Sequence, residues 1–387
     1  MRPTLALFFA LALPLSAHAQ KRLILIDQDG SGPGGSNQMS MLVLLQSPQT
    51  QVLGITMVTG NAWRDEETQH TLRMLELTGH ADIPVAMGAV FPLVRTEEET
   101  RLEAPLVGNV DWLGAWGGGP TNLSDSGQPE KGAAGKPSVI YQKTHDPYEI
   151  PPMPEGAPHL KSLNETTGED AVHFLIRQVH AHPHQVTIFA CGPMTNIALA
   201  IRTDAQFAEL TQGIILMGGS LNPQTKDPEF SESPRHEFNF WFDPEAAHIV
   251  LTAPWPRPED KYPGVGIVVT TVDISLQARF DQAMVDAIGK STNPAAQYIA
   301  KYSEERYYMW DEITAAAWLD PSIIAKEKYV YIDVDITHGP NYGNTLTWED
   351  KFRPERPLQK VHAQLDLDLP KFQKLFIDLM TAPTPMP

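Results

Sequence analysis

The chain has very little cysteine and few positive charges. Its 387 residues include one cysteine, Cys191, so no disulfide can form within the chain and a zinc site with several cysteine ligands is excluded. Lysine and arginine total 29 against 47 aspartates and glutamates, which gives a formal net charge of −18. Binding to a nucleic-acid polymer requires clustered basic residues, so this balance argues against such a partner. It is compatible with a neutral ligand, a cationic ligand or a metal ion.

Long apolar runs are absent beyond the first twenty residues, so we expect no membrane span in the mature chain. Those twenty residues, MRPTLALFFALALPLSAHAQ, combine the positive Arg2, an apolar core too short for a bilayer and the small-x-small stretch "AHA". This pattern predicts a cleavable signal peptide over residues 1–20. We therefore expect a mature protein that starts near Gln20 and is periplasmic or secreted. The alternative is an uncleaved N-terminal anchor.

The rest of the chain alternates between apolar, strand-like runs and amphipathic, helix-like stretches. The strand-like runs are Arg22–Ile26, Gln51–Val58, Gln185–Ala190, Gly213–Met217, Val265–Thr271 and Tyr329–Ile336. The helix-like stretches are Gln38–Gln46, Asp65–Thr78, Asp170–His180, Met194–Arg202, Pro244–Leu251, Gln282–Lys290, Pro294–Tyr302 and Ile313–Ala317. This alternation predicts an α/β fold with a mainly parallel central sheet and helices on both faces. Length alone would allow two domains, and we predict one domain over residues 21–387. In such sheets ligands bind at the carboxyl ends of the strands.

One segment, at about 117–161, interrupts this alternation. It is rich in glycine, proline and serine, as in "GGGPTNLSDSGQPEKGAAGKPS" and "PPMPEGAP". Irregular insertions of this length in a compact domain are either functional lids or passive, disordered segments. Both interpretations stay open from the sequence.

The loop after the first strand, "LIDQDGSGPGGSN", has two competing interpretations. Gly30, Gly32 and Gly35 form G-x-G-x-x-G between a strand and a helix, a pattern found at dinucleotide phosphates. Asp27 and Asp29 precede these glycines, and their i, i+2 spacing in a strand would project both carboxylates to one side. Converging carboxylates oppose a phosphate and favour a hard cation such as Ca2+, which accepts carboxylate, amide and backbone oxygens. A plain glycine-rich turn is the third possibility.

Five sequence blocks, taken in order, resemble the inosine-uridine preferring nucleoside hydrolase family. They are "LIDQD…MSMLVLLQSPQTQVLGITMVTGN", "TIFACGPMTNIALAI" at 187–201, "IILMGGS" at 214–220, "HEFNFWFDPEAAHIV" at 236–250 and "MWDEITAAAWLDPSI" at 309–323. The resemblance extends over about 22–336, which is nearly all of the mature chain. It implies a Ca2+-dependent enzyme that hydrolyses the N-glycosidic bond of nucleosides.

The resemblance also implies a metal site. By it, Asp29 binds Ca2+ and acts as the general base, and Asp27 supports it. Asn37 and Asp311 would supply further oxygen ligands, and Cys191 stands where the family offers a backbone carbonyl. A bound cation lowers the pKa of a water, whose proton a nearby carboxylate can then accept.

Further residues are expected to bind the sugar. The resemblance assigns ribose contacts to Asn61 and to Glu237 and Asn239, which would share one face if the segment is strand-like. Ser36 occupies another position that contacts ribose in the family. Asn196 in "GPMTN" is interpreted as structural, holding the turn into the next helix.

The chain departs from the family at its paired aspartates. Ser36 and Asn37 stand where the family has two adjacent aspartates, and the spacing from Asp29 is three residues longer. Fewer ligand charges should weaken Ca2+ binding. Loss of a hydrogen bond to a charged group costs roughly 1.5–3 kcal/mol. Asp27, the long glycine loop or Glu232 could compensate.

A second departure concerns the base. Trp310 replaces the histidine that precedes the late aspartate in many members, which resembles the purine-preferring branch where aromatic rings stack on the base. A second ring is expected from Trp116, with Trp112 nearly as suitable, and Tyr307 and Tyr308 lie on the same approach. Core packing is the alternative for each aromatic. Ala62 replaces an acidic residue of the purine-specific pattern, so strict purine specificity does not follow.

The favoured function is therefore hydrolysis of purine-leaning ribonucleosides with Ca2+, in a protein whose resemblance implies a dimer or tetramer. One rival is a non-catalytic relative that binds a nucleoside or sugar without cleaving it. Another is a hydrolase of a different N-ribosyl substrate. Asp29, Asp311 and "EFN" favour an enzyme, whereas loss of the aspartate pair favours a binder.

Overall fold

The fold is built on one nine-stranded, mostly parallel sheet. The computed structural model describes residues 21–108, 110, 112–117, 146–226, 228–231, 236–256, 266–303 and 308–385. The strand order is β3-β2-β1-β4-β5-β6-β9-β7-β8. β7 runs antiparallel to both β9 and β8, while the other neighbouring pairs are parallel. The strands are β1 (Arg22–Gln28), β2 (Thr50–Met57), β3 (Val85–Met87), β4 (Val186–Cys191), β5 (Gly213–Met217), β6 (Gly266–Thr270), β7 (Ile324–Val334), β8 (Thr345–Trp348) and β9 (Lys360–Leu367).

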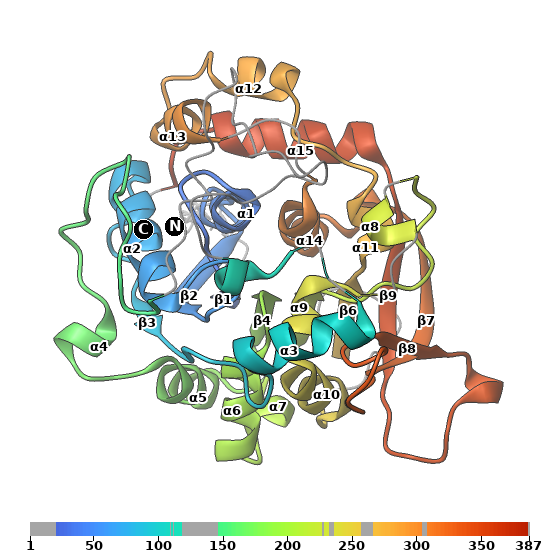
Figure 1. The fold of residues 1–387 in the computed structure, drawn as a ribbon. Coiled ribbons are helices and arrows are strands. Elements are labelled where there is room, and N and C mark those ends of the chain that lie inside the picture. The colour runs from blue at the N-terminus through green and yellow to red at the C-terminus, as the bar shows by residue number, and fades with distance from the viewer. Residues whose placement is uncertain are drawn as a thin grey trace, which may run out of the picture.

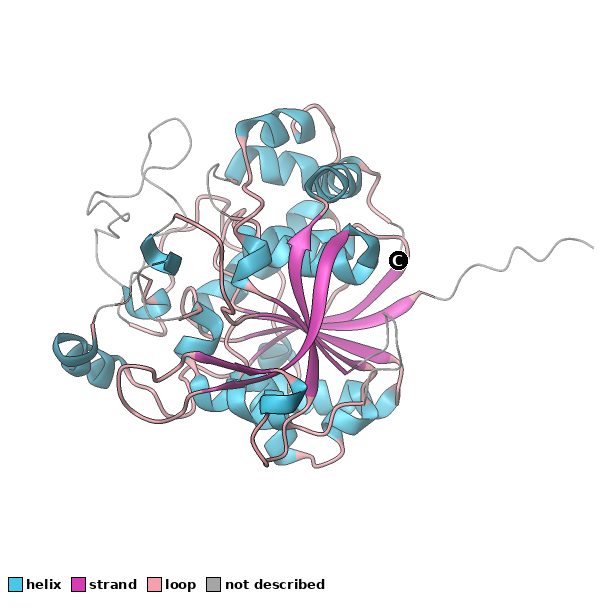
Figure 2. Ribbon diagram, turned by 90° about the vertical axis from the view of Figure 1, so that its right-hand side faces the viewer, coloured by secondary structure: helices cyan, strands magenta, loops and turns pink. Residues whose placement is uncertain are grey.

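Helices cover both faces of this twisted sheet (Figures 1 and 2). The longer helices are α1 (Ser36–Leu45), α2 (Arg64–Thr78), α3 (Glu97–Val107), α5 (Ala171–Ala181), α6 (Thr195–Thr203), α10 (Pro244–Thr252), α12 (Gln282–Ile288), α13 (Pro294–Tyr302), α14 (Trp310–Leu319) and α15 (Leu369–Thr381). The short ones are α4 (Leu163–Thr166), α7 (Phe207–Leu210), α8 (Pro228–Ser231), α9 (Phe238–Phe242) and α11 (Val272–Ser275). The predicted α/β fold is confirmed.

Each face of the sheet has its own hydrophobic core. Ile24 and Ile26 of β1 belong to the core formed with α1, α14 and α15, whereas Leu23 and Leu25 belong to the core formed with α5, α6 and α10. Alternating side chains of one strand therefore enter opposite cores. A strand that is apolar on both sides is what a parallel sheet covered by helices requires.

Some elements were not predicted from the sequence. β3 is three residues long, and β8 and β9 contain too many polar residues to form an apolar run. α3 carries no buried residue, so it lacks the apolar stripe that identifies a packed helix. The predicted apolar strands all exist, with boundaries shifted by a few residues, apart from β7, which begins five residues earlier than expected.

The predicted signal peptide lies wholly outside the described residues, and the glycine- and proline-rich insertion lies partly outside them. Its described end, from residue 146, runs along α2. Arg73 donates to the carbonyl of Glu155 at 2.9 Å, and Glu76 accepts from the backbone N–H of Leu160 at 2.7 Å. Within the described ranges, no helix has the length and hydropathy needed to cross a membrane. The single-domain assignment stays a prediction.

Candidate active site

The predicted site residues gather where the strand order reverses. The chain runs outward from β1 through β2 to β3 and then returns to β4, which pairs with the other side of β1. In open α/β sheets, ligands bind outside the carboxyl ends of the strands at such a switch point. Asp29 follows β1, Asn61 follows β2, and Cys191 ends β4 in register with Gln28. The topology alone therefore brings these segments to one edge of the sheet.

At this edge two buried carboxylates share one amide group. Asn37 Nδ2 donates to Asp29 Oδ1 at 2.8 Å and to Asp311 Oδ2 at 3.0 Å. Gln28 Nε2 also donates to Asp311 Oδ2, at 3.1 Å, and Gln28 Oε1 accepts from Asn37 at 3.0 Å. Asp29 and Gln28 are fully buried, and Asp311 and Asn37 are 4% and 6% exposed. We call these four residues the carboxylate–amide cluster.

Glycines on both sides hold Asp29 in place. A Cβ on Gly60 would lie 2.2 Å from Asp29 Oδ2, and one on Gly192 would lie 2.9 Å from the backbone nitrogen of Asp29. The backbone N–H of Asn61 donates to Asp29 Oδ2 at 2.9 Å. The two carboxylate oxygens of Asp29 thus have separate partners, which fixes the plane of the group.

Electrostatics make this cluster unfavourable for charge in the absence of a cation. Burial and the nearby charge of Asp311 raise the pKa of Asp29 well above its ordinary value. Burial raises the pKa of Asp311 to about 7; the hydrogen bonds from Gln28 and Asn37 lower it, and the charge of Glu237 raises it. Buried carboxylates with raised pKa values gain stability from any bound cation. The same features are common at catalytic sites.

The residues present fit a hard divalent cation. All four cluster side chains offer oxygen donors, two of them carboxylates, and Ca2+ takes six to eight such ligands. In the observed conformation Asn37 directs its N–H group at both carboxylates. Ligation through Asn37 Oδ1 therefore requires its amide to turn about χ2. Completion of the coordination shell would need backbone, water or substrate oxygens.

Cys191 is placed as expected for a carbonyl donor. It is the last residue of β4 and is 1% exposed. Burial raises the pKa of its thiol well above the ordinary value, and the charges of Asp311 and Asp29 raise it further. A hard cation prefers oxygen to sulfur ligands, so the backbone carbonyl of Cys191 is the donor group that suits Ca2+.

Asp27 does not join the cluster, contrary to the expectation of a shared side. Its Oδ1 accepts from Thr56 Oγ1 at 2.5 Å and from Asn196 Nδ2 at 2.8 Å. Asp27 continues the alternation of Leu23 and Leu25 and therefore faces α6, whereas Asn37 and Asp311 come from helices on the opposite face. β1 ends at Gln28, so Asp29 lies in the following turn, where side chains no longer alternate between the two faces as they do in a strand.

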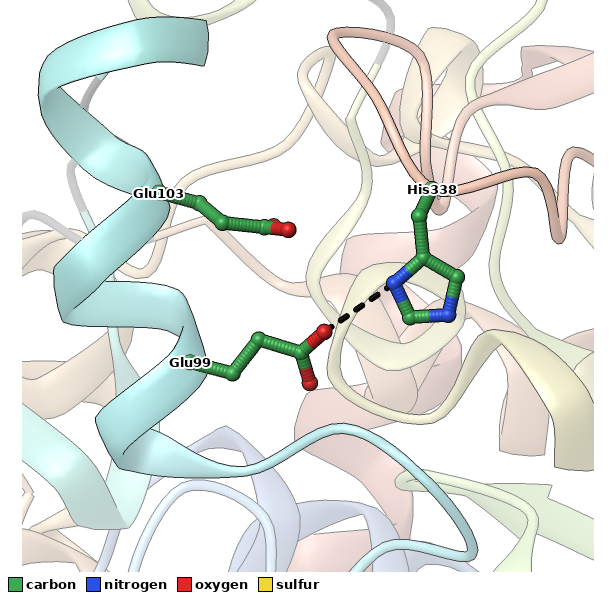
Figure 3. A group of neighbouring side chains, drawn as sticks. All are labelled: Glu99, Glu103 and His338. Carbon is green, nitrogen blue, oxygen red and sulfur yellow. Dashed lines mark ion pairs between the residues drawn. The ribbon is translucent and has the colours of Figure 1, made fainter.

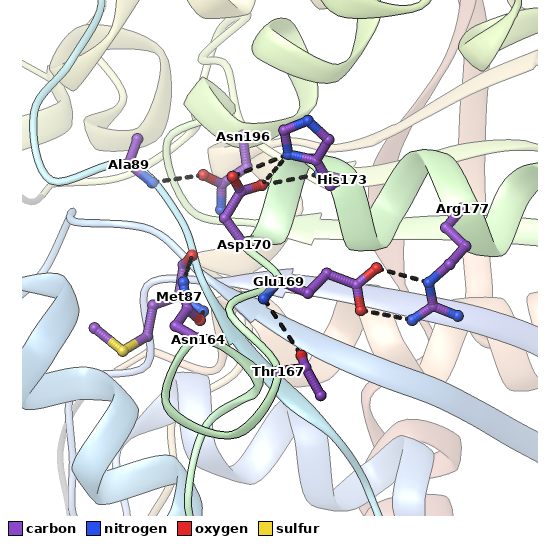
Figure 4. A network of polar contacts seen from close by, with 9 residues as sticks. All are labelled: Met87, Ala89, Asn164, Thr167, Glu169, Asp170, His173, Arg177 and Asn196. Atoms are coloured by element: carbon purple, nitrogen blue, oxygen red, sulfur yellow. Dashed lines mark hydrogen bonds and ion pairs between the residues drawn. The ribbon is translucent and has the colours of Figure 1, made fainter.

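Asn196 has the structural position that the sequence suggested. Its Nδ2 donates to Asp27 at 2.8 Å and to the carbonyl of Met57 at 3.1 Å. Its Oδ1 accepts from the backbone N–H of Ala89 at 2.8 Å, as Figure 4 shows. One side chain of α6 thus fastens β1, β2 and the segment after β3. This network positions the strand ends beneath the site.

The "EFN" segment is helical rather than strand-like. Glu237 caps α9: its carboxylate accepts from the backbone N–H groups of Asn239 at 2.8 Å, Phe240 at 3.1 Å and Gly219 at 3.0 Å. Asn239 Nδ2 donates to the carbonyl of Met217 at the end of β5, at 3.1 Å. Burial raises the pKa of Glu237 to about 7, although these backbone hydrogen bonds lower it. Both side chains therefore reach the strand-end edge by a route the sequence did not predict.

Of the aromatic candidates, Trp112 contacts a predicted ribose residue and Trp116 does not. Trp112 Nε1 donates to Asn61 Oδ1 at 2.7 Å. Trp116 is 2% exposed and packs on Phe242 with ring centroids 4.4 Å apart, in a separate apolar cluster. The expectation that Trp116 supplies the second ring is therefore replaced by core packing, and Trp112 is the better candidate.

Trp310 lies beside the cluster because it precedes Asp311 at the start of α14. It is partly buried, and its ring meets that of Tyr308 edge to face with centroids 5.5 Å apart. Tyr307 and Glu232, also considered from the sequence, lie outside the described residues. Ala62 is 1% exposed, and its N–H donates to Glu67 Oε1 at 2.9 Å.

Ser36 makes a contact that its sequence position does not predict. Its Oγ donates to Glu312 Oε2 at 2.6 Å, and Glu312 is fully buried on α14 next to Asp311. Gln28 was not predicted either. Both residues are next to predicted site residues in the sequence: Gln28 lies between Asp27 and Asp29, and Glu312 follows Asp311. This adjacency is the sequence feature that could have identified them.

A second group of metal-ligating side chains lies on the surface, outside this site. Glu99 and Glu103 of α3 face His338, and their ligand atoms all lie within 4.8 Å of one another (Figure 3). His338 Nδ1 is 3.0 Å from Glu99 Oε1. A cavity of about 260 Å³ adjoins this group, lined among others by Arg95, His236 and Trp241. We interpret the surface group as an ion pair that fastens α3 to the loop carrying His338.

Comparison with known proteins agrees with this geometry. The family model described as inosine-uridine preferring nucleoside hydrolase matches residues 24–374. A probable uridine nucleosidase 2 from Arabidopsis thaliana is 27% identical over 94% of this chain and 98% of its own. An inosine-uridine preferring nucleoside hydrolase from Leishmania major is 26% identical over 93% and 97% of the two chains.

Solved structures show the same fold. A plant nucleoside hydrolase superposes with a TM-score of 0.66 at 22% identity, covering 94% of this chain and 99% of the other. A purine-preferring ribonucleoside hydrolase from Gardnerella vaginalis gives a TM-score of 0.66 at 19% identity, covering 93% and 98%. The family match extends over nearly the whole chain and includes every residue of the carboxylate–amide cluster. The chain therefore belongs to the inosine-uridine preferring nucleoside hydrolase family and is an N-glycosyl hydrolase that acts on small nucleoside substrates.

Proposed function

We propose that the protein hydrolyses ribonucleosides to ribose and free base in a Ca2+-dependent reaction, with a preference for purine bases. The observation that carries the proposal is the carboxylate–amide cluster, in which Asp29 and Asp311 converge on Asn37 at 2.8 and 3.0 Å. Two buried carboxylates at a strand-end switch point suit a hard cation, which prefers oxygen ligands.

In this proposal Asp29 is the general base. When bound, Ca2+ supplies a positive charge that lowers the pKa of a water ligand. Asp29 would accept the proton of the attacking water, a role that requires a fixed carboxylate within hydrogen-bond reach. Gly60 and Gly192 restrict its position, and the N–H of Asn61 holds its Oδ2. Asp311, Asn37 and the carbonyl of Cys191 would hold the ion.

The sugar and the base would be held by separate residues. Glycoside cleavage passes through a state in which the sugar carries positive charge, so nearby carboxylates favour it. Asn61, Glu237 and Asn239 would bind ribose hydroxyls, and Trp112 keeps the Asn61 side chain in place through its 2.7 Å hydrogen bond. Trp310 would stack on the base, with the Tyr308 ring 5.5 Å away as a second aromatic surface.

The purine preference depends on Trp310. A wide indole surface overlaps a two-ring base more fully than a single-ring base, so stacking favours purines. Relatives differ in this respect: their names include pyrimidine-specific and purine-preferring enzymes as well as uridine nucleosidases. Base preference is therefore a property to be measured for each chain.

Ribose release from inosine, adenosine, guanosine, uridine and cytidine tests both parts of the proposal. We expect the highest kcat/KM on a purine nucleoside. Trp310→Ala should lower kcat/KM on purines more than on uridine, by roughly tenfold, the value of one lost stacking contact. Trp116→Phe, in the separate aromatic cluster, is the matched control. A higher kcat/KM of the parent protein on uridine or cytidine than on every purine nucleoside, or an equal loss on both classes in Trp310→Ala, would contradict the purine assignment.

Export and assembly complete the proposal. The charged start, apolar core and "AHA" of residues 1–20 support a cleavable signal peptide and a periplasmic or secreted protein. The family resemblance supports a homo-oligomer. N-terminal sequencing of the protein recovered from the host, and its mass in solution, test the two statements.

A further inference from the structure

Ser36 and Glu312 form a buried pair at the edge of the carboxylate–amide cluster. α1 packs against α14, which brings Ser36 at the start of α1 opposite Glu312 in the first turn of α14. Ser36 Oγ donates to Glu312 Oε2 at 2.6 Å and is 3.5 Å from the backbone nitrogen of Asp311. The neighbouring residue in each helix, Asn37 or Asp311, belongs to the cluster. The pair is therefore a direct extension of the proposed active site.

One oxygen of this pair lacks a partner. Among the described residues, none makes a hydrogen bond with Glu312 Oε1, although Glu312 is 0% exposed. A buried carboxylate oxygen without a hydrogen bond is costly, and such groups in native proteins usually await a water, an ion or a ligand. Ser36 is 9% exposed, so it is the more exposed member of the pair.

The direction of the hydrogen bond determines what Ser36 can offer a ligand. A serine hydroxyl has one proton and two lone pairs. Because that proton points to Glu312 and Oγ accepts from the backbone N–H of Asp311 at 3.5 Å, one lone pair of Oγ is left for another partner. A hydrogen bond to a carboxylate also polarises the hydroxyl, which makes its oxygen a stronger acceptor. The serine at this position therefore presents an acceptor, as a carboxylate would.

We propose that Ser36 and Glu312 together replace the carboxylate that the family resemblance expects at position 36, and accept a hydrogen bond from a ribose hydroxyl of the substrate. Ser36 contacts the sugar, and Glu312 is a positioning residue that orients and polarises the Ser36 hydroxyl. The carboxylate has moved from α1 to α14 while staying in contact with the same site. This inference rests on the proposed function, since it names how that site holds its sugar.

Replacement of the Glu312 carboxyl by an amide should invert the polarity of the contact. In Glu312→Gln the amide can donate to Ser36 Oγ, which turns the serine proton toward the substrate. We expect the KM for inosine to rise and kcat/KM to fall by roughly 10- to 100-fold, the range for one buried donor left without its acceptor. Ser36→Ala should have a similar effect, and the double variant should be no worse than either single variant.

Two further variants separate this role from a structural one. Ser36→Asp combined with Glu312→Gln returns the carboxylate to α1 and should restore the inosine KM to within a few-fold of the original value. Glu155→Gln alters another buried glutamate, one that contacts His70 outside the cluster, and should leave the KM unchanged. Deoxy analogues of inosine identify the hydroxyl: the analogue that lacks it should bind equally to the parent protein and to Glu312→Gln.

Binding measured by calorimetry in the Asp29→Asn background makes the test independent of turnover. Weaker inosine binding by roughly 10- to 100-fold in Glu312→Gln would support the pair. Unchanged binding in Glu312→Gln, or additive losses in the double variant, would overturn it. If the parent protein released no ribose from any nucleoside while Glu312→Gln still weakened inosine binding, the proposed hydrolysis would fail and the pair would stand.

Discussion

The side-chain amide of Asn37 donates a hydrogen bond to Asp29 at 2.8 Å, where the family resemblance expects a second metal-binding carboxylate. The same nitrogen reaches Asp311 at 3.0 Å. The amide reduces the repulsion between two buried carboxylates, so the cluster can fold without an ion. It also supplies no charge to a bound cation. We therefore expect this amide to favour the metal-free state and to lower the affinity for a metal ion.

Asn37→Asp should reverse this balance. A third carboxylate should tighten Ca2+ binding by about tenfold, because affinity follows ligand charge. Without the ion, the same substitution should destabilise the fold by roughly 3 kcal/mol, since it adds an uncompensated buried charge. Calorimetric titration with Ca2+ and thermal unfolding in chelator measure the two effects.

The control for that substitution is Asn164→Asp. The Asn164 side chain bonds the N–H and the carbonyl of Met87 at 2.6 and 3.0 Å, away from the cluster (Figure 4). Asn164→Asp should lower the free energy of unfolding without changing the Ca2+ affinity. Equal Ca2+ affinity in Asn37→Asp and the parent protein would mean that Asn37 is not a ligand.

Asp27→Asn should be a stability defect with little effect on metal binding. Asp27 accepts hydrogen bonds from Thr56 and Asn196, and its burial raises its pKa to about 7. Both hydrogen bonds end on Oδ1, and asparagine keeps one oxygen that can accept them, so the loss is that of the carboxylate charge, at a cost of roughly 1 kcal/mol. Chemical unfolding measures the loss, and a Ca2+ titration provides the contrast. A large loss of Ca2+ affinity in Asp27→Asn would show that Asp27 contributes to the metal site.

Gly60→Ala should inactivate the enzyme by displacing Asp29. The new Cβ would lie 2.2 Å from Asp29 Oδ2, so the carboxylate must move. A displacement of about 1 Å in a catalytic group costs on the order of 100-fold in rate. Gly289→Ala is the control, because the nearest atoms to its Cβ are 3.1 and 3.4 Å away and lie outside the site. Ribose release by both variants measures this effect, and circular dichroism confirms that both are folded. Full activity in Gly60→Ala would contradict the assigned position of Asp29.

The buried ion pairs of His70 should make stability depend on pH. Burial alone would lower the pKa of His70, but hydrogen bonds with Glu155 and Glu66 outweigh it and raise the pKa from 6.5 to about 9. The folded pKa exceeds the unfolded one, so the stabilisation is fully present below about pH 6.5 and is lost as the pH rises through about 9.

Unfolding free energies between pH 6 and 10 test this statement. His70→Gln should remove a pH-dependent contribution on the order of 3 kcal/mol. His173, which contacts Asp170 on the surface with 70% of its side chain exposed, is the control, and His173→Gln should change little. An identical pH profile in His70→Gln and the parent protein would exclude the charged His70.

The apolar strands and the location of the site at their carboxyl ends were predictable, because both follow from side-chain periodicity. The separation of the Asp27 and Asp29 side chains onto different sides of the sheet was not predictable, because it depends on β1 ending at Gln28. The contact of Glu312 with Ser36 was not predictable, because the two residues lie 276 positions apart in the chain. Trp116 and Trp112 look alike in sequence, and only packing shows that the first contacts Phe242 and the second Asn61.

The sequence pattern also does not predict helices that lack an apolar stripe. α3 exposes Leu102 and Leu106 to 69% and 83%, so periodicity gives no sign of the face it presents to the protein. The helical form of "EFN" depends on the cap that Glu237 makes with its own following N–H groups. That local hydrogen bond outweighs the preference of aromatic residues for strands.

The most direct test of the central claim is ribose release from inosine by the mature protein, before and after removal of divalent ions with chelator and after return of Ca2+. Asp29→Asn serves as the variant that keeps the fold and removes the proposed base. We predict that chelation abolishes activity, that Ca2+ restores it, and that Asp29→Asn stays at least 100-fold less active with Ca2+ present, the contribution expected of a general base. Full activity in chelator, or activity in Asp29→Asn equal to that of the parent protein, would contradict a calcium-dependent reaction at the carboxylate–amide cluster.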